Sequence, residues 1–306
     1  MKIYHHNDLD GYCAGFWVRL SVGIKPDSKG NIHWKTSDIN YNQKFPIEEI
    51  EKDEQVWIVD FSIEPLEMLE LLKITKDVTW IDHHKTSIEK YKDFPHEIRG
   101  IRKDGESGCV LTFKYIHWWT ARGDGLINLN NEVLDNPVPE FTKLIGDRDI
   151  WKFEFGDKTK YFYLGCQLYD WANLDSPFWN MSFVYGNEGI ERIVQEGKVS
   201  ERYRINFSKR YLQSLSFPVE FEGYSCLAMN MGLCSSEYFL DNDKKFDILM
   251  PFVFDGKKWT ISLYTIKPEI DVSKIAQKYG GGGHKGASGF VTNSLPFVPL
   301  GKYHER

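Results

Sequence analysis

Short apolar runs alternate with amphipathic stretches in the first half of the chain. Strands are predicted at residues 1–4, 55–59 and 78–81, where mostly apolar residues follow one another. Between these runs, residues 11–22 and 63–74 carry apolar side chains at helical spacing. This alternation predicts an α/β domain with a parallel sheet and crossover helices, and such sheets bind ligands at the carboxyl ends of their strands.

The second half of the chain follows a different pattern. Residues 189–215 are polar, mixed in charge and helical in character, which predicts a connector. Beyond it we expect strands at 219–229, 248–254 and 259–265, the last two joined by a hairpin turn, and a helix at 272–278. The predicted organisation is a domain at 1–188, a helical connector at 189–215 and a smaller α/β domain at 216–306.

Composition narrows the classes of function. Lys and Arg total 38 against 44 Asp and Glu, for a net charge of -6. A broad basic face for long duplex nucleic acid is therefore not expected, because such binding needs many Lys and Arg contacts. Five cysteines without a C-x-x-C pair argue against a disulfide scaffold and a structural zinc site. No apolar run has membrane length and the N-terminus is polar, so we expect a cytoplasmic protein, for which the sequence allows a homodimer.

Acidic and imidazole side chains follow each of the three predicted strands of the first domain. One aspartate at such a place is typical of a helix cap, but caps do not account for the number present. Clustered carboxylates repel one another unless cations neutralise them, and a mixed carboxylate and imidazole set suits Mn²⁺. We therefore expect two divalent metal ions, Mn²⁺ in the first place, with Mg²⁺ or Co²⁺ as alternatives. The residues are His6, Asp8, Asp10, Asp60, Asp82, His83 and His84.

A two-metal site needs one ligand that bridges both ions and further ligands on each. Asp60 is the predicted bridge, because its strand lies between the other two in chain order. His6 and Asp8 are expected on one ion, and Asp10 and His83 on the other.

Two further roles follow from the same motifs. His84 remains to face the substrate, and Asp82 is expected to orient the histidines. A second acid pair, Asp147 and Asp149, flanks an arginine. A D-R-D sequence by itself is equally typical of a surface turn. Beside the other motifs, one of the pair is expected to complete the second ion's ligands, with a narrow preference for Asp147.

The second domain contains the sequence GGGGHKGASG at 280–289. Consecutive glycines let the backbone approach a ligand and point amide groups at an anion. The alternative is that the run is only a flexible loop. The histidine and lysine that follow add hydrogen-bond donors. We expect a phosphate cradle formed by Gly281, Gly282, Gly283, His284 and Lys285.

Together these motifs resemble the DHH phosphoesterase superfamily with its DHH-associated C-terminal domain. The sequences HNDLDG, VDFS, DHH and GGGGHKGASG occur in the family's order over nearly the whole chain, with a family-like SGCVL at 107–111. The resemblance implies two α/β domains facing each other across a cleft, with two Mn²⁺ ions in the first. It implies that His84 contacts the scissile phosphate and that His284 with its glycines holds the substrate. The residues that match the family's metal ligands are His6, Asp8, Asp10, Asp60 and His83.

Two departures from the family pattern leave the substrate open. Tyr264 stands where many relatives have an arginine, so a phosphate contact is absent or falls to Lys267. The sequence DRDIW replaces the D-T-x-x-F of the nanoRNA-degrading branch. We expect hydrolysis of short oligonucleotides or nucleotide phosphates, with no long duplex and no membrane as partner. The alternatives are a phosphatase for polyphosphate, pyrophosphate or a small metabolite, and a non-catalytic nucleotide sensor.

An aromatic-rich segment spans residues 153–185. Its rings could stack on nucleobases. We expect most of them to pack inside the protein instead, because aromatic side chains dominate burial.

Overall fold

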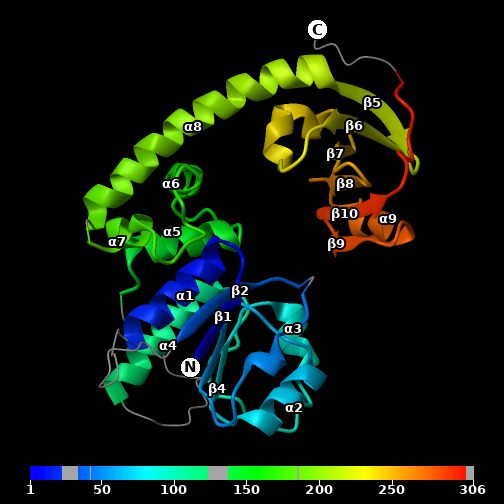
Figure 1. The fold of residues 1–306 in the computed structure, drawn as a ribbon. Helices are drawn as coiled ribbons and strands as arrows, with labels where there is room; N and C mark the ends of the chain where they lie inside the picture. Colours follow the sequence, from blue (N-terminus) through cyan, green and yellow to red (C-terminus); the bar gives the residue numbers. More distant parts are fainter. Residues whose placement is uncertain (23–33, 42, 123–136, 185, 301–306) are drawn as a thin grey trace. The chain divides into compact units, whose positions relative to one another are not determined.

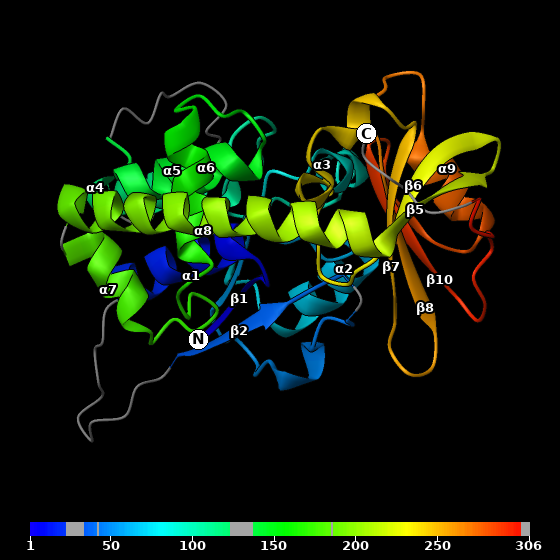
Figure 2. The ribbon, with the colours of Figure 1, turned by 90° about the horizontal axis from the view of Figure 1, so that it is seen from above.

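The chain forms two compact units in a computed structural model that describes residues 1–22, 34–41, 43–122, 137–184 and 186–300. Unit 1 is Met1–Val199 and unit 2 is Ser200–Arg306. The boundary falls inside α8 (Gly186–Leu215), a single long helix that contains the whole predicted connector (Figure 2). Among the described residues, no helix is both long enough and apolar enough to cross a membrane.

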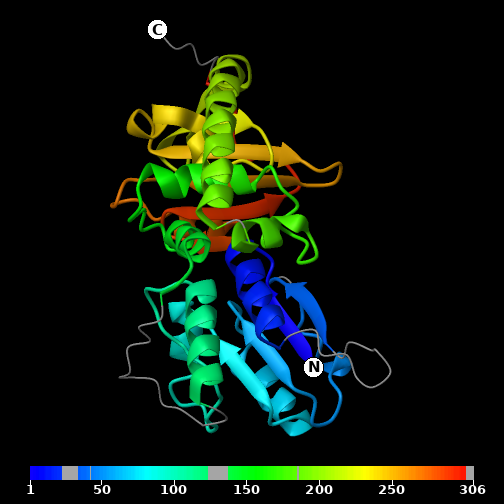
Figure 3. The same cartoon turned by 90° about the vertical axis from the view of Figure 1, so that its left-hand side faces the viewer.

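Unit 1 is built on a four-stranded, fully parallel sheet with the order β2-β1-β3-β4 (Figure 3). This confirms the predicted α/β class. Strand β2 was not predicted, because its sequence KTSDI is mostly polar and it pairs only with β1 at the edge. The strands are β1 (Lys2–His6), β2 (Lys35–Ile39), β3 (Val56–Val59) and β4 (Val78–Ile81).

Helices cover both faces of this sheet (Figure 1). Successive residues of β3 alternate between two cores, since Trp57 and Val59 pack with α1 and α4, while Val56 and Ile58 pack with α2. Burial on both faces is what a parallel sheet requires. The helices of this layer are α1 (Leu9–Val22), α2 (Pro65–Ile74), α3 (Lys85–Lys90) and α4 (Gly108–Arg122), with a short 3-10 turn at Ile47–Glu49.

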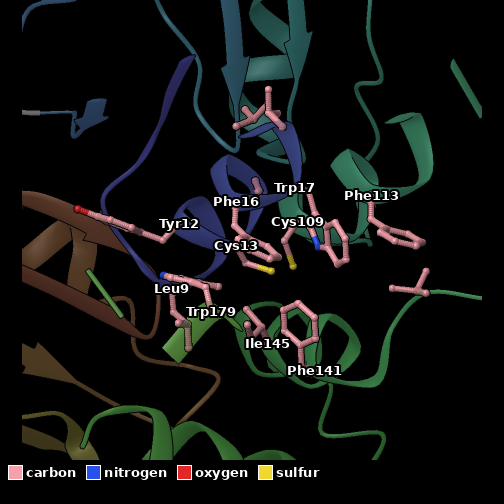
Figure 4. Close-up of a cluster of buried hydrophobic side chains, with 14 of the residues drawn as sticks. Leu9, Tyr12, Cys13, Phe16, Trp17, Cys109, Phe113, Phe141, Ile145 and Trp179 are labelled. Atoms are coloured by element: carbon pink, nitrogen blue, oxygen red, sulfur yellow. The ribbon is translucent and has the colours of Figure 1, made fainter. Parts of the chain in front are cut away.

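A large aromatic core holds α5 (Glu140–Asp149) against α1 and α4 (Figure 4). Trp17 stacks on Phe141 with ring centroids 5.7 Å apart, and its indole N–H donates to Thr142 Oγ1 at 3.0 Å. This packing anchors α5, the helix whose carboxyl end carries Asp147 and Asp149. Two further helices, α6 (Asp157–Cys166) and α7 (Pro177–Val184), complete unit 1 together with the start of α8.

Unit 2 contains a six-stranded sheet with the order β5-β6-β7-β8-β10-β9, in which only β6 and β7 run parallel. The single strand predicted at 219–229 is wrong, because Glu222 and Gly223 form a tight turn that makes two strands of it. Both residues have positive φ, 53° and 82°, as a two-residue hairpin turn requires. The strands are β5 (Ser216–Phe221), β6 (Tyr224–Asn230), β7 (Ile248–Phe254) and β8 (Trp259–Tyr264).

The glycine-rich run follows α9 (Val272–Lys278), a helix that the sequence predicts with the same bounds. The run is not an irregular loop, because β9 (Gly282–His284) pairs with β10 (Ala287–Thr292) in an antiparallel hairpin. One face of the sheet packs on α9, and the other packs on the end of α8 and a 3-10 segment at Ser236–Lys244.

Candidate metal centre

The carboxyl ends of β1, β3 and β4 meet at one edge of the parallel sheet, because the three strands are neighbours in register. Acidic and imidazole side chains that follow these strands form three overlapping groups. In each group, one potential ligand atom per residue lies within 4.8 Å of the others. The groups are His6, Asp8 and Asp60; Asp60, His83 and His84; and Asp10, His83 and Asp149.

Asp60 lies in the middle of this arrangement. Its Oδ1 is 3.1 Å from His83 Nε2, and its Oδ2 is 4.0 Å from His6 Nδ1. The residue follows β3 with a φ of 53°, a left-handed conformation that is costly for any residue with a Cβ. It is also packed against α4, since a Cβ on Gly108 would lie 2.4 Å from Asp60 Oδ1. Only glycine at that position leaves room for the carboxylate.

Asp8 both caps a helix and faces the potential metal ligands. Its Oδ1 accepts a hydrogen bond from the Gly11 amide at 2.9 Å, which is a helix cap at the start of α1. Its Oδ2 lies 2.7 Å from His6 Nδ1. Capping therefore does not compete with the site, because each oxygen serves one purpose.

Asp10 is held by the start of a different helix. Both of its oxygens accept backbone hydrogen bonds from α4, at 2.7 Å from Gly108 and 3.2 Å from Cys109. This explains the SGCVL sequence, whose part in the site could not be predicted from the residues alone. The contact leaves Asp10 buried, with its Oδ2 4.0 Å from His83 Nε2.

Asp82 orients the histidines that follow it. The buried carboxylate accepts hydrogen bonds from the His83 amide at 2.8 Å and from Ser62 Oγ, and its Oδ1 lies 2.7 Å from His84 Nδ1. Burial acts to lower the pKa of His84, but the hydrogen bond and charge of Asp82 outweigh it and raise that pKa. Ser62, from the VDFS sequence, is a supporting residue that sequence reasoning missed.

The alternation of β1 separates the two adjacent histidines at its end. His6 reaches the metal centre, whereas His5 is buried with its ring edge-on to Tyr12 and a potential Cβ of Gly15 2.6 Å from its ring. Burial lowers the pKa of His5 to about 4, which keeps it neutral in the core.

Several carboxylates lie close together in this site, and the described residues do not supply enough positive charge to neutralise them. Burial, with the charges of Asp10 and Asp8, raises the pKa of Asp60 well above its ordinary value, and the same causes raise the pKa of Asp149. Two buried atoms that face the site, Asp60 Oδ1 and His6 Nδ1, have no hydrogen-bond partner among the described residues. The 2.7 Å approach of His6 to Asp8 does not have hydrogen-bond geometry. Atoms of this kind are what a metal cation would bind, so the residues fit a metal.

The geometry favours Asp149 over Asp147, against the narrow preference drawn from sequence. Asp147 turns away and accepts hydrogen bonds from the Glu154 amide at 2.8 Å, the Phe155 amide at 3.3 Å and the Thr159 hydroxyl. Asp149 Oδ2 lies instead 3.4 Å from His83 Nε2. Two residues along a helix point about 200° apart, so only one of the pair can face the site.

Tyr41 is a further residue that the sequence did not single out. It follows the edge strand β2, half exposed, with its ring stacked on Phe61 at 4.6 Å and 5.8 Å from the ring of His84. Tyr41 could not be singled out from the sequence, because the strand before it, β2, has no apolar pattern.

The predicted substrate-binding residues of unit 2 lie on an exposed edge. Strand β9, with Gly282, Gly283 and His284, is exposed, and Lys285 lies in the turn after it. A Cβ on Gly281 would lie 2.1 Å from a backbone oxygen of β10, so this glycine serves close packing of the hairpin. Lys267 is committed elsewhere, in an ion pair with Asp247 at 2.5 Å.

Most aromatic residues of the 153–185 segment that the structure describes pack inward, as expected. Phe162, Phe178 and Trp179 are buried in the core of unit 1, and Tyr163 lies against it. Phe155 is exposed. Tyr185 and the side chain of Phe183 lie outside the described residues.

Comparison with known proteins agrees with the motifs. Residues 1–137 match the model of the DHH family, N-terminal domain. The chain is 25% identical over 306 residues to oligoribonuclease NrnB of Bacillus subtilis, covering 94% of this chain and 71% of that protein. It is 24% identical over 317 residues to the uncharacterized protein R106 of Acanthamoeba polyphaga mimivirus, covering 96% of this chain and 69% of that protein.

Among solved structures, exonuclease RecJ bound to manganese is similar with a TM-score of 0.47 and 14% identity, over 95% of this chain and 85% of that one. The family match agrees with the resemblance that the motifs carry: residues 1–137 match the DHH family, N-terminal domain, whose members are phosphoesterases.

Proposed function

We propose that this protein hydrolyses the phosphodiester bonds of short oligonucleotides or dinucleotides, using two divalent metal ions with Mn²⁺ as the preferred metal. The observation that carries the proposal is the sharing of ligands in the metal centre. Asp60 belongs to two of the three potential ligand groups, and His83 also belongs to two. Shared ligands are typical of two ions held a few ångströms apart.

Each ion would have its own ligands besides the shared ones. His6 and Asp8 supply one position beside Asp60, while Asp10 and Asp149 supply the other beside His83. Asp147 is not part of this set, because its carboxylate accepts hydrogen bonds from the Glu154 amide and from the Thr159 hydroxyl of α6. When bound, the ions would polarise the phosphoryl oxygens and lower the pKa of the attacking water.

The chain's own residues would then position the substrate and oppose its negative charge. His84 is held through Nδ1 by Asp82, which leaves Nε2–H to donate a hydrogen bond to a phosphoryl oxygen. The hydrogen bond and charge of Asp82 raise the pKa of His84, and a protonated imidazole at this place would oppose the negative charge that develops in the reaction. Asp82 is held in turn by Ser62, so the imidazole is oriented before the substrate binds.

Short substrates are supported by composition and by a relative. The net charge of -6 disfavours a long nucleic-acid track, and the similar protein of Bacillus subtilis is named an oligoribonuclease. The five free cysteines accord with action in the reducing cytoplasm.

The test is a panel of substrates with the purified protein and Mn²⁺. It contains the dinucleotides pApA and pGpG, a five-nucleotide RNA, a 3',5'-bisphosphonucleotide, pyrophosphate and polyphosphate. We expect the dinucleotides and the short RNA to be hydrolysed fastest. Preferential release of phosphate from pyrophosphate or polyphosphate would replace the proposal by a phosphatase function, and binding of nucleotides without turnover would replace it by a sensor.

Two variants sharpen this panel. His84→Ala should lower kcat by roughly 100-fold or more while Mn²⁺ binding persists, because it removes a group that acts on the reacting phosphate. Asp93→Asn is the control, since this exposed acid lies outside the metal centre and should leave the rate unchanged.

A further inference from the structure

A cavity of about 210 Å³ adjoins the metal centre within unit 1. One wall is formed by the metal-centre carboxylates of Asp8, Asp10 and Asp149. The other is formed by Arg148 at the end of α5, Trp151 in the turn after it and Tyr163 of α6. Its volume lies below the roughly 300–1,000 Å³ of pockets for drug-sized ligands. It therefore suits one ring system and not a complete dinucleotide.

Arg148 presents a flat cationic group in this cavity. Its guanidinium carbon lies 4.0 Å from the ring centre of Trp151 and 4.5 Å from that of Tyr163. Among the described residues, its side chain has no ion pair with a carboxylate within 4.0 Å. Stacking on two rings leaves the in-plane N–H groups available to acceptors on a ligand.

Trp151 is held in an unusual conformation at the mouth of the same cavity. Its side chain is 60% exposed, and its φ of 54° is left-handed, as is the φ of 50° at Phe153. The buried Asp147 supports this turn, because its backbone oxygen accepts from the Lys152 amide and its side chain accepts from the Glu154 amide. An exposed tryptophan on a strained but well-supported turn indicates a contact with a ligand.

From these observations we propose that the cavity binds the nucleobase of a nucleotide that flanks the scissile phosphate, purines in preference to pyrimidines. The inference rests on the proposed function and adds the part of the substrate that decides specificity. A neutral base fits better than a second phosphate, because a phosphate here would face the carboxylates of Asp8, Asp10 and Asp149. Trp151 supplies a face for stacking, and Arg148 supplies donors for ring acceptors such as N7 and O6 of guanine.

The test compares substrates with and without a base. The wild type and Trp151→Ala are assayed with Mn²⁺ on pGpG and on an analogue in which each base is replaced by hydrogen. We expect Trp151→Ala to lower kcat/KM for pGpG by roughly 5- to 100-fold, the range of one lost base stack, and to leave the analogue unchanged. Trp151→Phe should restore most of the loss. Equal losses on both substrates would overturn the inference and make Trp151 a structural residue.

Two further measurements separate this inference from the proposed function. Binding of GMP and of ribose 5-phosphate is measured by calorimetry with no turnover required, and the advantage of GMP should disappear in Trp151→Ala and in Arg148→Met. Leu66→Ala, an exposed residue on α2 outside the cavity, is the control that should keep it. If no phosphodiester is hydrolysed, the proposed function fails, while a base-dependent binding difference lost in both variants still supports the subsite. Absence of that difference in the wild type overturns it.

Discussion

Replacing Asp60 by Asn should stabilise the metal-free protein and at the same time remove most of the stabilisation that metal provides. Asp60 is fully buried, and burial together with the charges of Asp10 and Asp8 raises its pKa. In the absence of metal, the Asp60 carboxyl of the folded protein therefore either carries a charge that its neighbours repel or binds a proton. Binding a proton at neutral pH costs free energy relative to the unfolded chain. The amide of Asn has nearly the same shape and carries no charge.

The magnitude follows from the distances in the metal centre. Potential ligand atoms of Asp60 and Asp8 lie within 4.8 Å, so two full charges would repel by about 3 kcal/mol at an effective dielectric of roughly 20. Asp8 is 44% exposed, which lowers this value, and we expect a net gain of about 2 kcal/mol for the variant. For a unit of 199 residues that corresponds to a rise in Tm of roughly 4 to 8 °C.

The assay is thermal unfolding after removal of metal, repeated with Mn²⁺ added. At a free concentration about 100 times the Kd, the metal should stabilise the wild type by about 2.7 kcal/mol, a rise of roughly 5 to 11 °C. The Asp60→Asn variant should start higher and gain little, so the order of the two Tm values reverses on addition of metal. Asp93→Asn should follow the wild type in both conditions. A variant that melts lower without metal, or that gains as much from Mn²⁺ as the wild type, would refute the reasoning.

Three other predictions concern the metal centre and an ion pair in unit 2. Asp149→Asn should weaken Mn²⁺ binding by roughly 10-fold or more in calorimetric titration, whereas Asp147→Asn should leave Mn²⁺ affinity nearly unchanged and lower stability by about 1–3 kcal/mol, since it removes acceptors for buried donors. The reverse result would exchange their roles. Gly108→Ala should weaken Mn²⁺ binding in the same titration, because its Cβ would meet the carboxylate of Asp60; unchanged affinity would show that the site adapts. Asp247 has a pKa below its ordinary value of 3.8 through hydrogen bonds from Lys267 and Ser225, so it stabilises the fold above that pH. The difference in Tm between wild type and Asp247→Asn should vanish as the pH falls below about 3.8, and a difference independent of pH would contradict this role.

The ends of the parallel strands could be predicted from sequence, because their signal is local. Buried strands such as VWIV and VTWI read as continuous apolar runs, and the first polar residues after them are the ones at the sheet edge. Parallel pairing then brings these positions together without knowledge of any loop. The convergence of His6, Asp60 and His83 follows from that topology alone.

Other features depend on contacts distant in sequence and could not be predicted. The choice between Asp147 and Asp149 is decided by the direction of the last turn of α5 and by amides of the segment that leads into α6. The role of Gly108 depends on a close approach to Asp60, 48 positions earlier in the chain. For the glycine-rich run of unit 2 the sequence predicts a phosphate cradle and no strand, because glycine weakens any strand signal, yet pairing with β10 makes Gly282–His284 a strand.

The metal centre and the adjoining cavity share one physical property. Each contains a residue in a strained backbone conformation that the rest of the fold must support. Asp60 and Trp151 have left-handed backbones, and each is held by contacts from another segment: Gly108 for the first and Asp147 for the second. Strain of this kind persists only where the surrounding structure imposes it. The contacts of Asp147 therefore make it a support for the turn at Trp151, whereas its place in the sequence suggests a metal ligand. If Asp147 served folding alone, Asp147→Asn would leave the base selectivity unchanged. Loss of base selectivity in Asp147→Asn, with Mn²⁺ affinity retained, would link the two sites through this turn.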